Sequence, residues 1–270
     1  MENSLKNKPN ISMIVLTKNK NKLLKDLLNS IKDKSSYPKD KLTIYVADTG
    51  SNEPVLLETE NIVKEFNEFY KTFLIKYDFY NFAKINNDVV FNHIDKKTDV
   101  ILFSNNDIRL KNDAISIMTS LMDENTGTVG ARLLYEDETV QHCGIAFIKE
   151  GDRYGFIHAF HGFENKDLVG LPSVLSFPLG NTGAFLMIDK NKFENVKGFN
   201  EKYKVCFEDV ELNLKMWLNG YLNKTSTESI CYHLESATRG PSVNQDDVKN
   251  IMSRMLSLPD INKIITKIDA

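Results

Sequence analysis

The first half of the chain alternates short apolar runs with segments of helical periodicity. Leu24, Leu27, Leu28 and Ile31 recur at the spacing of one helical face. Further helical faces are expected from Ile62, Val63, Phe66, Phe69 and Tyr70, and from Ala114, Ile115, Met118, Leu121 and Met122. The apolar runs at 11–16, 42–47, 73–75 and 99–104 are expected to be buried strands. This alternation predicts an α/β fold with a mostly parallel sheet covered by helices on both faces.

Polar turns follow three of these strands, at 17–20, 48–51 and 104–107. In sheets of this kind, ligands bind beyond the carboxyl ends of the strands. All three turns are expected at that edge, so together they indicate a ligand site more strongly than any one of them does.

The second half has a less regular pattern. The stretch 144–180 is rich in glycine and aromatic residues without a clear period, which predicts an inserted hairpin and long loops. A helix is expected over 208–218, ended by Gly220 as a C-cap, and a short strand over 229–232. Apolar residues return at helical spacing between Val248 and Leu256, which predicts a last helix packed on the domain.

Length, charge and cysteines restrict the class of protein. A chain of 270 residues can form one large α/β domain, or a domain with an appendage. A net charge of -3 disfavours general nucleic-acid binding, which needs a basic surface. Cys143, Cys206 and Cys231 are widely spaced and match neither a disulfide framework nor a zinc pattern. Reduced thiols in a cytoplasmic protein are the simplest interpretation.

The pattern shows no sign of a membrane span or an export signal. No apolar run approaches the roughly 18 residues of a spanning helix, and residues 1–10 are polar, unlike a signal peptide. A cytoplasmic location is expected, and peripheral membrane contact through a lipid-linked acceptor stays compatible with the sequence.

Carboxylates stand at two of the strand ends. Asp48 precedes Thr-Gly-Ser and can accept hydrogen bonds from a nucleobase or ribose, or can simply cap its own turn. Asp107 follows Asn105 and Asn106. It can serve a hard divalent cation on a diphosphate, because such a cation takes one or two carboxylates and leaves its other positions to phosphate and water. Asn-Asn-Asp is also a good turn sequence, so a structural role stays open for Asp107 too.

Two further candidates lie in the second half. Asp209 falls at the start of the 208–218 helix, where it can face a cleft as a general base. The helix dipole alone would also favour an aspartate there, and Glu208 and Glu211 fit the same bias. His233 follows the short strand and can ligate a metal. A lone histidine after a strand is, however, more often a hydrogen-bonded structural residue.

Taken together, the short sequence motifs along the chain resemble those of the family 2 glycosyltransferases of GT-A fold, in particular the bacterial type that builds surface polysaccharides. The resemblance covers about 11 to 240. Its motifs lie at 14–19, 48–51, 80–87, 105–107, 129–135, 141–144, 182–187, 198–201, 208–212, 233–236 and 239–240. Each motif is weak alone, and the set in this order and spacing is specific. A Rossmann-like GT-A fold is implied.

The resemblance implies a donor site for a nucleoside-diphosphate sugar. Its residues would be Thr17, Asp48, Asn81, Lys84, Asn105 and Arg239. Arg239 would lie near the diphosphate, where a guanidinium suits phosphate oxygens.

The resemblance also implies a catalytic apparatus. Asp107 and His233 would hold Mn²⁺ or Mg²⁺, and Asp209 would be the general base. Glu208 and Gly183 would lie at the acceptor.

Two departures from the family pattern are visible. The usual Asp-x-Asp is Asn105-Asn106-Asp107 here, so one carboxylate is left for the metal. The segment after Gly240 does not match clearly. We therefore expect a glycosyltransferase domain over 1–240 and a C-terminal helical extension over 241–270.

The expected reaction transfers a sugar, with inversion, from a UDP- or dTDP-type nucleotide sugar to a hydroxyl of a glycan or a lipid-linked acceptor. Two alternatives stay open. A nucleotidyltransferase of similar fold would release pyrophosphate, and would be expected to carry a glycine-rich, Lys/Arg-bearing loop after the first strand, which this sequence lacks. A non-catalytic nucleotide- or sugar-binding module would show no turnover. The sequence leaves open the sugar, the acceptor, the choice of metal and the oligomeric state.

Overall fold

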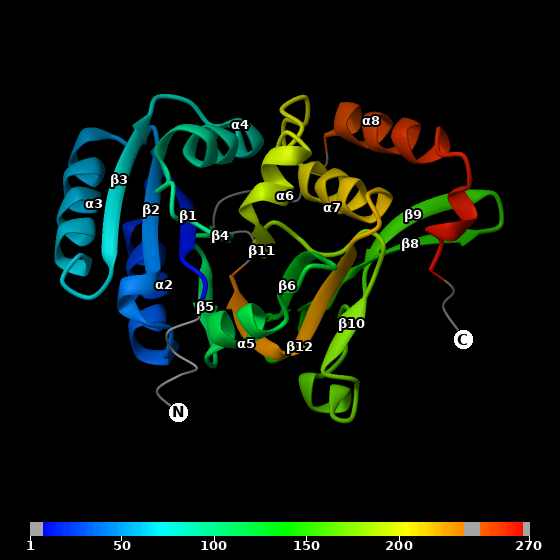
Figure 1. The fold of residues 1–270 in the computed structure, drawn as a ribbon, viewed down its shortest axis with the longest axis horizontal. Helices are drawn as coiled ribbons and strands as arrows, with labels where there is room; N and C mark the ends of the chain where they lie inside the picture. The colour runs from blue at the N-terminus through cyan, green and yellow to red at the C-terminus, as the bar shows by residue number, and fades with distance from the viewer. Residues whose placement is uncertain (1–7, 235–243, 267–270) are drawn as a thin grey trace.

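A ten-stranded sheet between two layers of helices forms the body of the protein (Figure 1). The computed structural model describes residues 8–234 and 244–266. The strands of this sheet are β1 (Ile11–Thr17), β2 (Leu42–Thr49), β3 (Lys71–Tyr77), β4 (Val100–Asn105), β5 (Ile108–Leu110), β6 (Thr126–Leu134), β7 (Val140–His142), β10 (Val174–Ser176), β11 (Phe185–Asp189) and β12 (Leu222–His233). A separate hairpin pairs β8 (Ile145–Glu150) with β9 (Arg153–His158).

The strand order confirms a mostly parallel sheet. Along the path β10-β12-β6-β11-β4-β1-β2-β3, four of the seven neighbouring pairs are parallel. β11 runs antiparallel between β4 and β6 and joins the two parallel parts. The short strands β5 and β7 pair with β12 and β6.

Helices cover both faces of the sheet (Figure 1). They are α2 (Asn21–Lys34), α3 (Glu53–Phe66), α4 (Phe82–Asp88), α5 (Ala114–Ser120), α6 (Lys190–Asn195), α7 (Glu208–Leu218) and α8 (Gln245–Leu256). One core joins the sheet to α2, α3 and α5, and the other joins it to α4, α6 and α7. Short 3₁₀ turns occupy Lys39–Lys41, Asn165–Leu168 and Ile261–Lys263, and a π turn, Val89–His93, follows α4.

The apolar stripes predicted from the sequence are the stripes that the helices bury. Leu24, Leu27, Leu28 and Ile31 of α2 are all at most 1% exposed. Burial of each such side chain contributes about 1.5–3 kcal/mol. In the second half of the chain, α7 ends at Leu218, as predicted. Gly220, just beyond it, adopts the left-handed conformation at φ +83°.

A third core attaches α8 to the rest of the molecule. Ile251 and Met255 of α8 are fully buried in one cluster with Val210 and Leu214 of α7 and with side chains of the β8–β9 hairpin. Just beyond α8, the amide of Thr266 donates to the carbonyl of Phe147 in β8 at 2.8 Å. The C-terminal helix thus bridges α7 and the hairpin.

The structure departs from the pattern in several elements. β12 runs over Leu222–His233, whereas the sequence predicts only 229–232, because polar residues such as Thr225 and Ser226 are buried there instead of solvated. The second helix ends at Phe66, and Tyr70 packs from the following turn. The pattern also gives no strand for β6 or β11, although both carry motifs of the resemblance.

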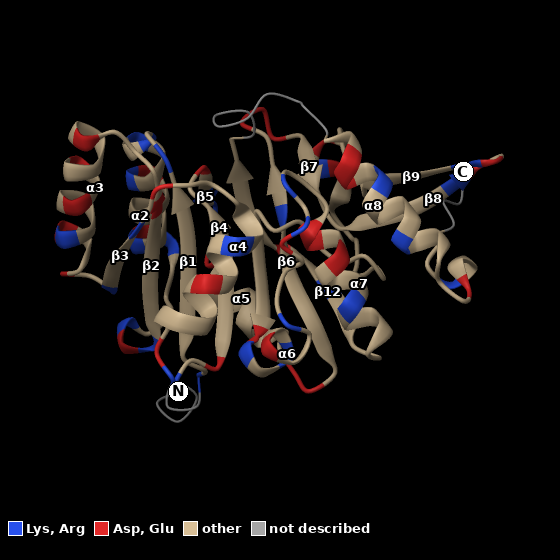
Figure 2. Cartoon of the chain, turned by 90° about the horizontal axis from the view of Figure 1, so that it is seen from above, with Lys and Arg blue, Asp and Glu red and all other residues tan. Residues whose placement is uncertain are grey.

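Charges of both signs are spread over the outer elements. Figure 2 shows Lys and Arg interspersed with Asp and Glu along α2, α3 and α8. None of the helices within 8–234 and 244–266 is long and apolar enough to cross a bilayer.

Candidate functional site

The three predicted polar turns meet at one edge of the sheet. In the parallel register, Thr17 lies opposite Asp48 on one side of β1, and Leu16 lies opposite Asn105 on the other. Inside this edge, the Asn106 amide donates to the Thr17 hydroxyl at 3.0 Å. The ends of β1, β2 and β4 therefore form one surface, as the sequence predicts.

Asp48 caps its own turn, which is one of the two roles considered for it. Its Oδ1 accepts the backbone N–H groups of Gly50, at 3.1 Å, and Ser51, at 2.8 Å, which caps the turn. Its Oδ2 is buried and has no hydrogen-bond partner within the described residues. A buried acceptor left unpaired costs about 1–3 kcal/mol. One oxygen of Asp48 thus shapes the loop, and contact of the other with a nucleotide stays a prediction.

Asp107 and His233 lie side by side, although they come from distant parts of the chain. The His233 Nε2 is 3.3 Å from the Asp107 Oδ1, and both residues are less than a tenth exposed. The carbonyl oxygen of the Gln141 side chain accepts from His233 Nδ1 at 2.6 Å. Because that oxygen can only accept, Nδ1 carries the proton in this bond. When the ring is neutral, the lone pair on Nε2 therefore faces Asp107.

This pair fits a hard divalent cation. Asp107 Oδ1 is buried and has no hydrogen-bond partner among residues 8–234 and 244–266. Two ligand atoms at right angles, each about 2.1 Å from an octahedral cation, lie about 3 Å apart, close to the separation seen here. No group of three or more His, Cys, Asp or Glu side chains in the described ranges could hold a metal by itself. The remaining positions would fall to diphosphate and water.

Asn105 links this pair to the opposite side of the site. Its side-chain amide nitrogen lies 3.3 Å from His233 Nε2, and its backbone N–H donates to the carbonyl of Ala184 at 2.9 Å. The residue before Ala184 is Gly183, whose N–H donates to Asp209 Oδ2 at 2.8 Å. A short chain of contacts therefore joins the candidate metal ligands to the candidate base.

Asp209 lies in the first turn of α7, as the sequence predicts, and is firmly oriented. Its Oδ1 accepts the N–H of Val210 at 2.7 Å, while Gly183 holds Oδ2. A Cβ on Gly183 would lie only 3.2 Å from the Phe82 ring, so glycine allows this close approach. The role of Gly183 visible in the structure is to position Asp209.

Glu208 has very different surroundings from its neighbour. Its side chain is buried, and Oε2 has no hydrogen-bond partner in the part of the chain that the structure describes. Burial, then the charges of Asp209 and Asp247, raise the pKa of Glu208 to about 8. Glu208 therefore carries a proton for most of the time at neutral pH. Two adjacent carboxyl groups with such different surroundings are a common feature of acid–base sites.

A buried amide network underlies the start of α7. Asn181, Asn213 and Asn223 are all fully buried. The Asn213 amide donates to the carbonyls of Asp209, at 2.8 Å, and Asn181, at 2.7 Å. Because Asn181 is two residues before Gly183, this network fixes the base relative to the loop that orients it.

The three-residue strand β7 supports both halves of the site, which the sequence analysis missed. Successive strand residues point to opposite faces. Gln141 reaches His233, while His142 Nε2 accepts the N–H of Thr182 at 3.5 Å. Burial, followed by the nearby His158, lowers the pKa of His142 well below its usual range and keeps the ring neutral. In the sequence, only the motif at 141–144 indicated that Gln141 and His142 have a role in the site.

The other predicted donor residues have local roles that are visible in the structure. The Asn81 side chain caps α4 by accepting the N–H of Lys84 at 2.8 Å. The exposed Lys84 ammonium lies 5.1 Å from the centre of the Phe79 ring. Arg239 lies outside the described residues. Contact of these three side chains with a nucleotide stays a prediction.

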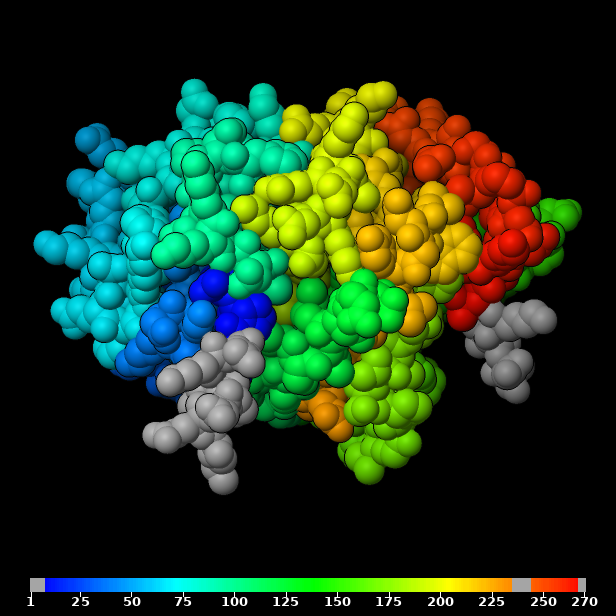
Figure 3. Space-filling model, viewed as in Figure 1, coloured from blue at the N-terminus to red at the C-terminus, as the bar shows by residue number. Residues whose placement is uncertain are grey.

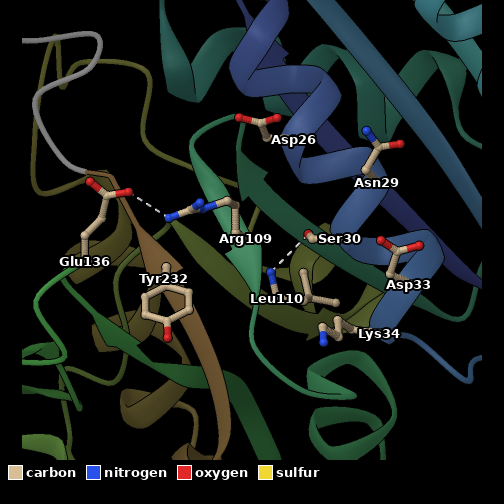
Figure 4. A pocket seen from close by; sticks show the side chains of 9 residues that line it. All are labelled: Asp26, Asn29, Ser30, Asp33, Lys34, Arg109, Leu110, Glu136 and Tyr232. Carbon is tan, nitrogen blue, oxygen red and sulfur yellow. Dashed lines mark hydrogen bonds and ion pairs between the residues drawn. The ribbon is translucent and has the colours of Figure 1, made fainter.

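A separate open pocket of about 550 Å³ lies between α2 and β5 (Figure 4). Arg109 and Glu136 form an ion pair there at 2.8 Å. Tyr232 lines this pocket, but its neighbour His233 points to the other face of the strand. The pocket is therefore not part of the candidate site.

Comparison with known sequences gives distant relatives. No family model matches the chain. It is 25% identical over 244 residues to the O-antigen biosynthesis protein RfbC of Myxococcus xanthus, and 28% identical over 235 residues to the uncharacterized protein y4gI of Sinorhizobium fredii. Each alignment covers 86% of this chain, but only 18% and 25% of the two relatives. The chain thus spans a quarter or less of the relatives that it matches.

Comparison with solved structures defines the fold. A mannosyltransferase from Pyrobaculum calidifontis, PcManGT, matches with a TM-score of 0.63 at 17% identity, covering 87% of this chain and 59% of its own. GalNAc-T7 matches with a TM-score of 0.68 at 13% identity, covering 92% and 48%. S. aureus TarS, residues 1–349, matches with a TM-score of 0.64 at 16% identity, covering 94% and 68%.

The protein therefore has the GT-A fold of glycosyltransferases, as the motifs predict. The resemblance to the surface-polysaccharide type also agrees with the similarity to an O-antigen biosynthesis protein.

Proposed function

We propose that the protein is an inverting glycosyltransferase of family 2 that moves a sugar from a nucleoside-diphosphate sugar to a hydroxyl of a glycan or a lipid-linked acceptor. The observation that carries this proposal is that a candidate metal site, which follows β4, and a candidate base, held by the residue two before β11, are joined by a short chain of contacts. On one side stand Asp107 and His233, which fit a divalent cation. On the other stands Asp209, held by Gly183. This is the arrangement needed to bind a diphosphate and activate a hydroxyl next to it.

In the proposed reaction, the acceptor hydroxyl gives its proton to Asp209 while its oxygen bonds to the anomeric carbon. The bond from that carbon to the diphosphate oxygen breaks, and the nucleoside diphosphate leaves. The hydrogen bonds from Gly183 and Val210 orient the Asp209 carboxylate, and each of its oxygens keeps a lone pair. When bound to Asp107 and His233, Mn²⁺ or Mg²⁺ would neutralise the charge of the leaving group.

Glu208 is proposed to orient the acceptor. A protonated carboxyl can donate a hydrogen bond to a hydroxyl oxygen, which an ionised one cannot. Asp209 would take the proton of the reacting hydroxyl, so Glu208 would contribute only to holding the acceptor in place.

The donor is proposed to be a UDP- or dTDP-sugar, bound at the strand ends that carry Thr17 and Asp48. TarS and GalNAc-T7 were solved with UDP or a UDP-sugar, whereas PcManGT was solved with GDP-mannose and Mn²⁺. Thermal shifts with UDP, dTDP and GDP in Mn²⁺ test this choice. UDP or dTDP should stabilise the protein, and stabilisation by GDP alone would show that the donor is a guanosine nucleotide.

A panel of nucleotide sugars tests the reaction class. The purified protein with Mn²⁺ should release a nucleoside diphosphate, by slow hydrolysis alone and faster with a hydroxyl acceptor. Release of pyrophosphate from a sugar phosphate and a nucleoside triphosphate would indicate a nucleotidyltransferase instead. Nucleotide binding with no turnover on a verified acceptor would indicate a binding module.

A further inference from the structure

Asp247 in the first turn of α8 is buried against the loop that leads into the catalytic helix. It is 0% exposed. Its Oδ2 accepts the backbone N–H groups of Val205, at 2.8 Å, Lys204, at 3.1 Å, and Cys206, at 3.3 Å. Its Oδ1 also accepts from Lys204, at 3.1 Å. Three successive amides thus converge on one carboxylate, which is a strong, charge-assisted arrangement.

The loop held in this way ends at the proposed base. Phe207, which follows it directly, has the left-handed conformation at φ +73° and starts α7 without a side-chain cap. Such a conformation in a bulky residue costs about 1–2 kcal/mol and persists only where the surroundings enforce it. The Phe207 ring packs on Phe156 of the β8–β9 hairpin at a centroid distance of 5.2 Å. Asp247 and this ring contact together fix the turn that places Glu208 and Asp209.

Packing places α8 where it can hold this loop. Figure 3 shows α8, in orange, against the gold surface of α7. Ile251 and Met255 share a core with Val210 and Leu214, which follow Asp209 on α7. The helix is thus attached to both the loop before Asp209 and the helix after it.

We propose that Asp247 is a positioning residue for the catalytic turn, so that α8, in the segment 241–270 that the family resemblance does not cover, is a working part of the active site. This inference rests on the proposed function, since it takes Asp209 as the base. Asp247 acts through the backbone of 204–206 and touches neither donor nor acceptor. It should therefore affect the chemical step and leave donor binding at the distant strand ends unchanged.

The chain offers a matched control in the adjacent residue. Asp246 has the same charge and lies in the same turn of α8, but it is exposed, and within the described residues its carboxylate makes only an ion pair with the Lys204 ammonium at 3.8 Å. Asp247→Asn and Asp246→Asn therefore remove the same charge from the same turn. Only the first also removes an acceptor from the three converging amides and a charge that raises the pKa of Glu208, so amide exchange at 204–206 is the measurement that isolates the positioning role.

Two measurements on the full chain test the proposal. Amide hydrogen exchange should accelerate at 204–206 in Asp247→Asn, with the interior of α7 still protected, and should be unchanged in Asp246→Asn. Turnover should fall by about 10- to 100-fold in Asp247→Asn, the scale expected for a base displaced by about 1 Å, with the KM for the donor unchanged. Asp246→Asn should keep wild-type turnover.

Asp247→Glu provides a second test of the proposal if Asp247→Asn does not fold. It keeps the carboxylate but adds a methylene, so the amides cannot converge in the same geometry, and turnover should lie between those of the other forms. Wild-type exchange at 204–206 and wild-type turnover in either Asp247 variant would overturn the proposal. The exchange measurement needs no substrate, so it judges the positioning role even if the wild-type protein transfers no sugar.

Discussion

Glu208 and Asp209 are neighbours in sequence, yet they occupy opposite electrostatic surroundings. Asp209 receives two backbone N–H bonds, and Glu208 receives none at its buried Oε2. Successive residues on a helix point about 100° apart, so one carboxyl can face Gly183 while the other enters the protein. Sequence patterns can place both at a helix start, but they cannot show which is desolvated, because that depends on α8 and the 203–207 loop.

The raised pKa of Glu208 makes a prediction about stability. Between its ordinary pKa and about 8, the folded state holds the proton and the unfolded state has lost it. Unfolding free energy should therefore fall as pH rises through this window, by up to about 1.4 kcal/mol per pH unit. Glu208→Gln should remove this contribution, as measured by urea unfolding at about pH 5, 6.5 and 8.

Glu65→Gln, on the exposed surface of α3, is the matched control and should keep the wild-type slope. If Glu208→Gln and the wild type show the same pH dependence, Glu208 does not hold a proton in the folded state.

Among the elements, α7 depends on the amide network beneath it. Gly180 belongs to this layer, with φ +59° and space too small for a side chain. A Cβ there would lie 2.1 Å from the Asn213 Oδ1. Hydrogen bonds to these asparagines, such as that from the Thr225 hydroxyl to Asn181 Oδ1 at 2.6 Å, allow the polar strand β12 to be buried in this region.

Gly180→Ala should destabilise the protein by about 2–5 kcal/mol, the sum of overpacking and a left-handed backbone. Gly151→Ala is the matched control, because Gly151 has φ +57° with nothing within 4 Å of the added Cβ. It should lose only the backbone part, about 1–2 kcal/mol. Equal losses in thermal or urea unfolding would show that Gly180 is not packed as described.

The elements differ in how well the sequence predicts them. β1, β2, β4 and α2 follow from apolar runs and helical periodicity, because each is buried on a regular pattern. β12 does not, because its burial is satisfied by hydrogen bonds such as that from Thr225 to Asn181. The role of Gln141 could not be predicted either, since it depends on a three-residue strand pairing with β6.

Over the whole molecule, the fold brings together residues that the sequence keeps far apart. Asp107 follows β4, His233 ends β12, and Gln141 comes from β7 between them. The motifs could suggest the first two through resemblance, but their contact follows from the strand order. The same order brings Asp209 to this edge through β11.

Asp107→Ala and His233→Ala should each weaken binding of a nucleoside diphosphate in Mn²⁺ without unfolding the protein, as measured by calorimetry. Gln141→Leu should weaken Mn²⁺ binding by about 10- to 100-fold, the usual effect of losing a partner of a metal-bound histidine. Asp152→Ala, in the exposed turn between β8 and β9, is the control and should have no effect. Undiminished turnover in excess EDTA would show that Asp107 and His233 form only an ion pair.

The central claim is that Asp209 takes the proton of the acceptor, and turnover of Asp209→Asn on a verified acceptor tests it most directly. Asparagine keeps the size of the side chain and removes the basic oxygen. The account predicts a fall in turnover of about 10²–10⁴-fold with donor affinity unchanged, and a smaller loss for Glu208→Gln. Turnover of Asp209→Asn close to that of the wild type would mean that another group takes the proton.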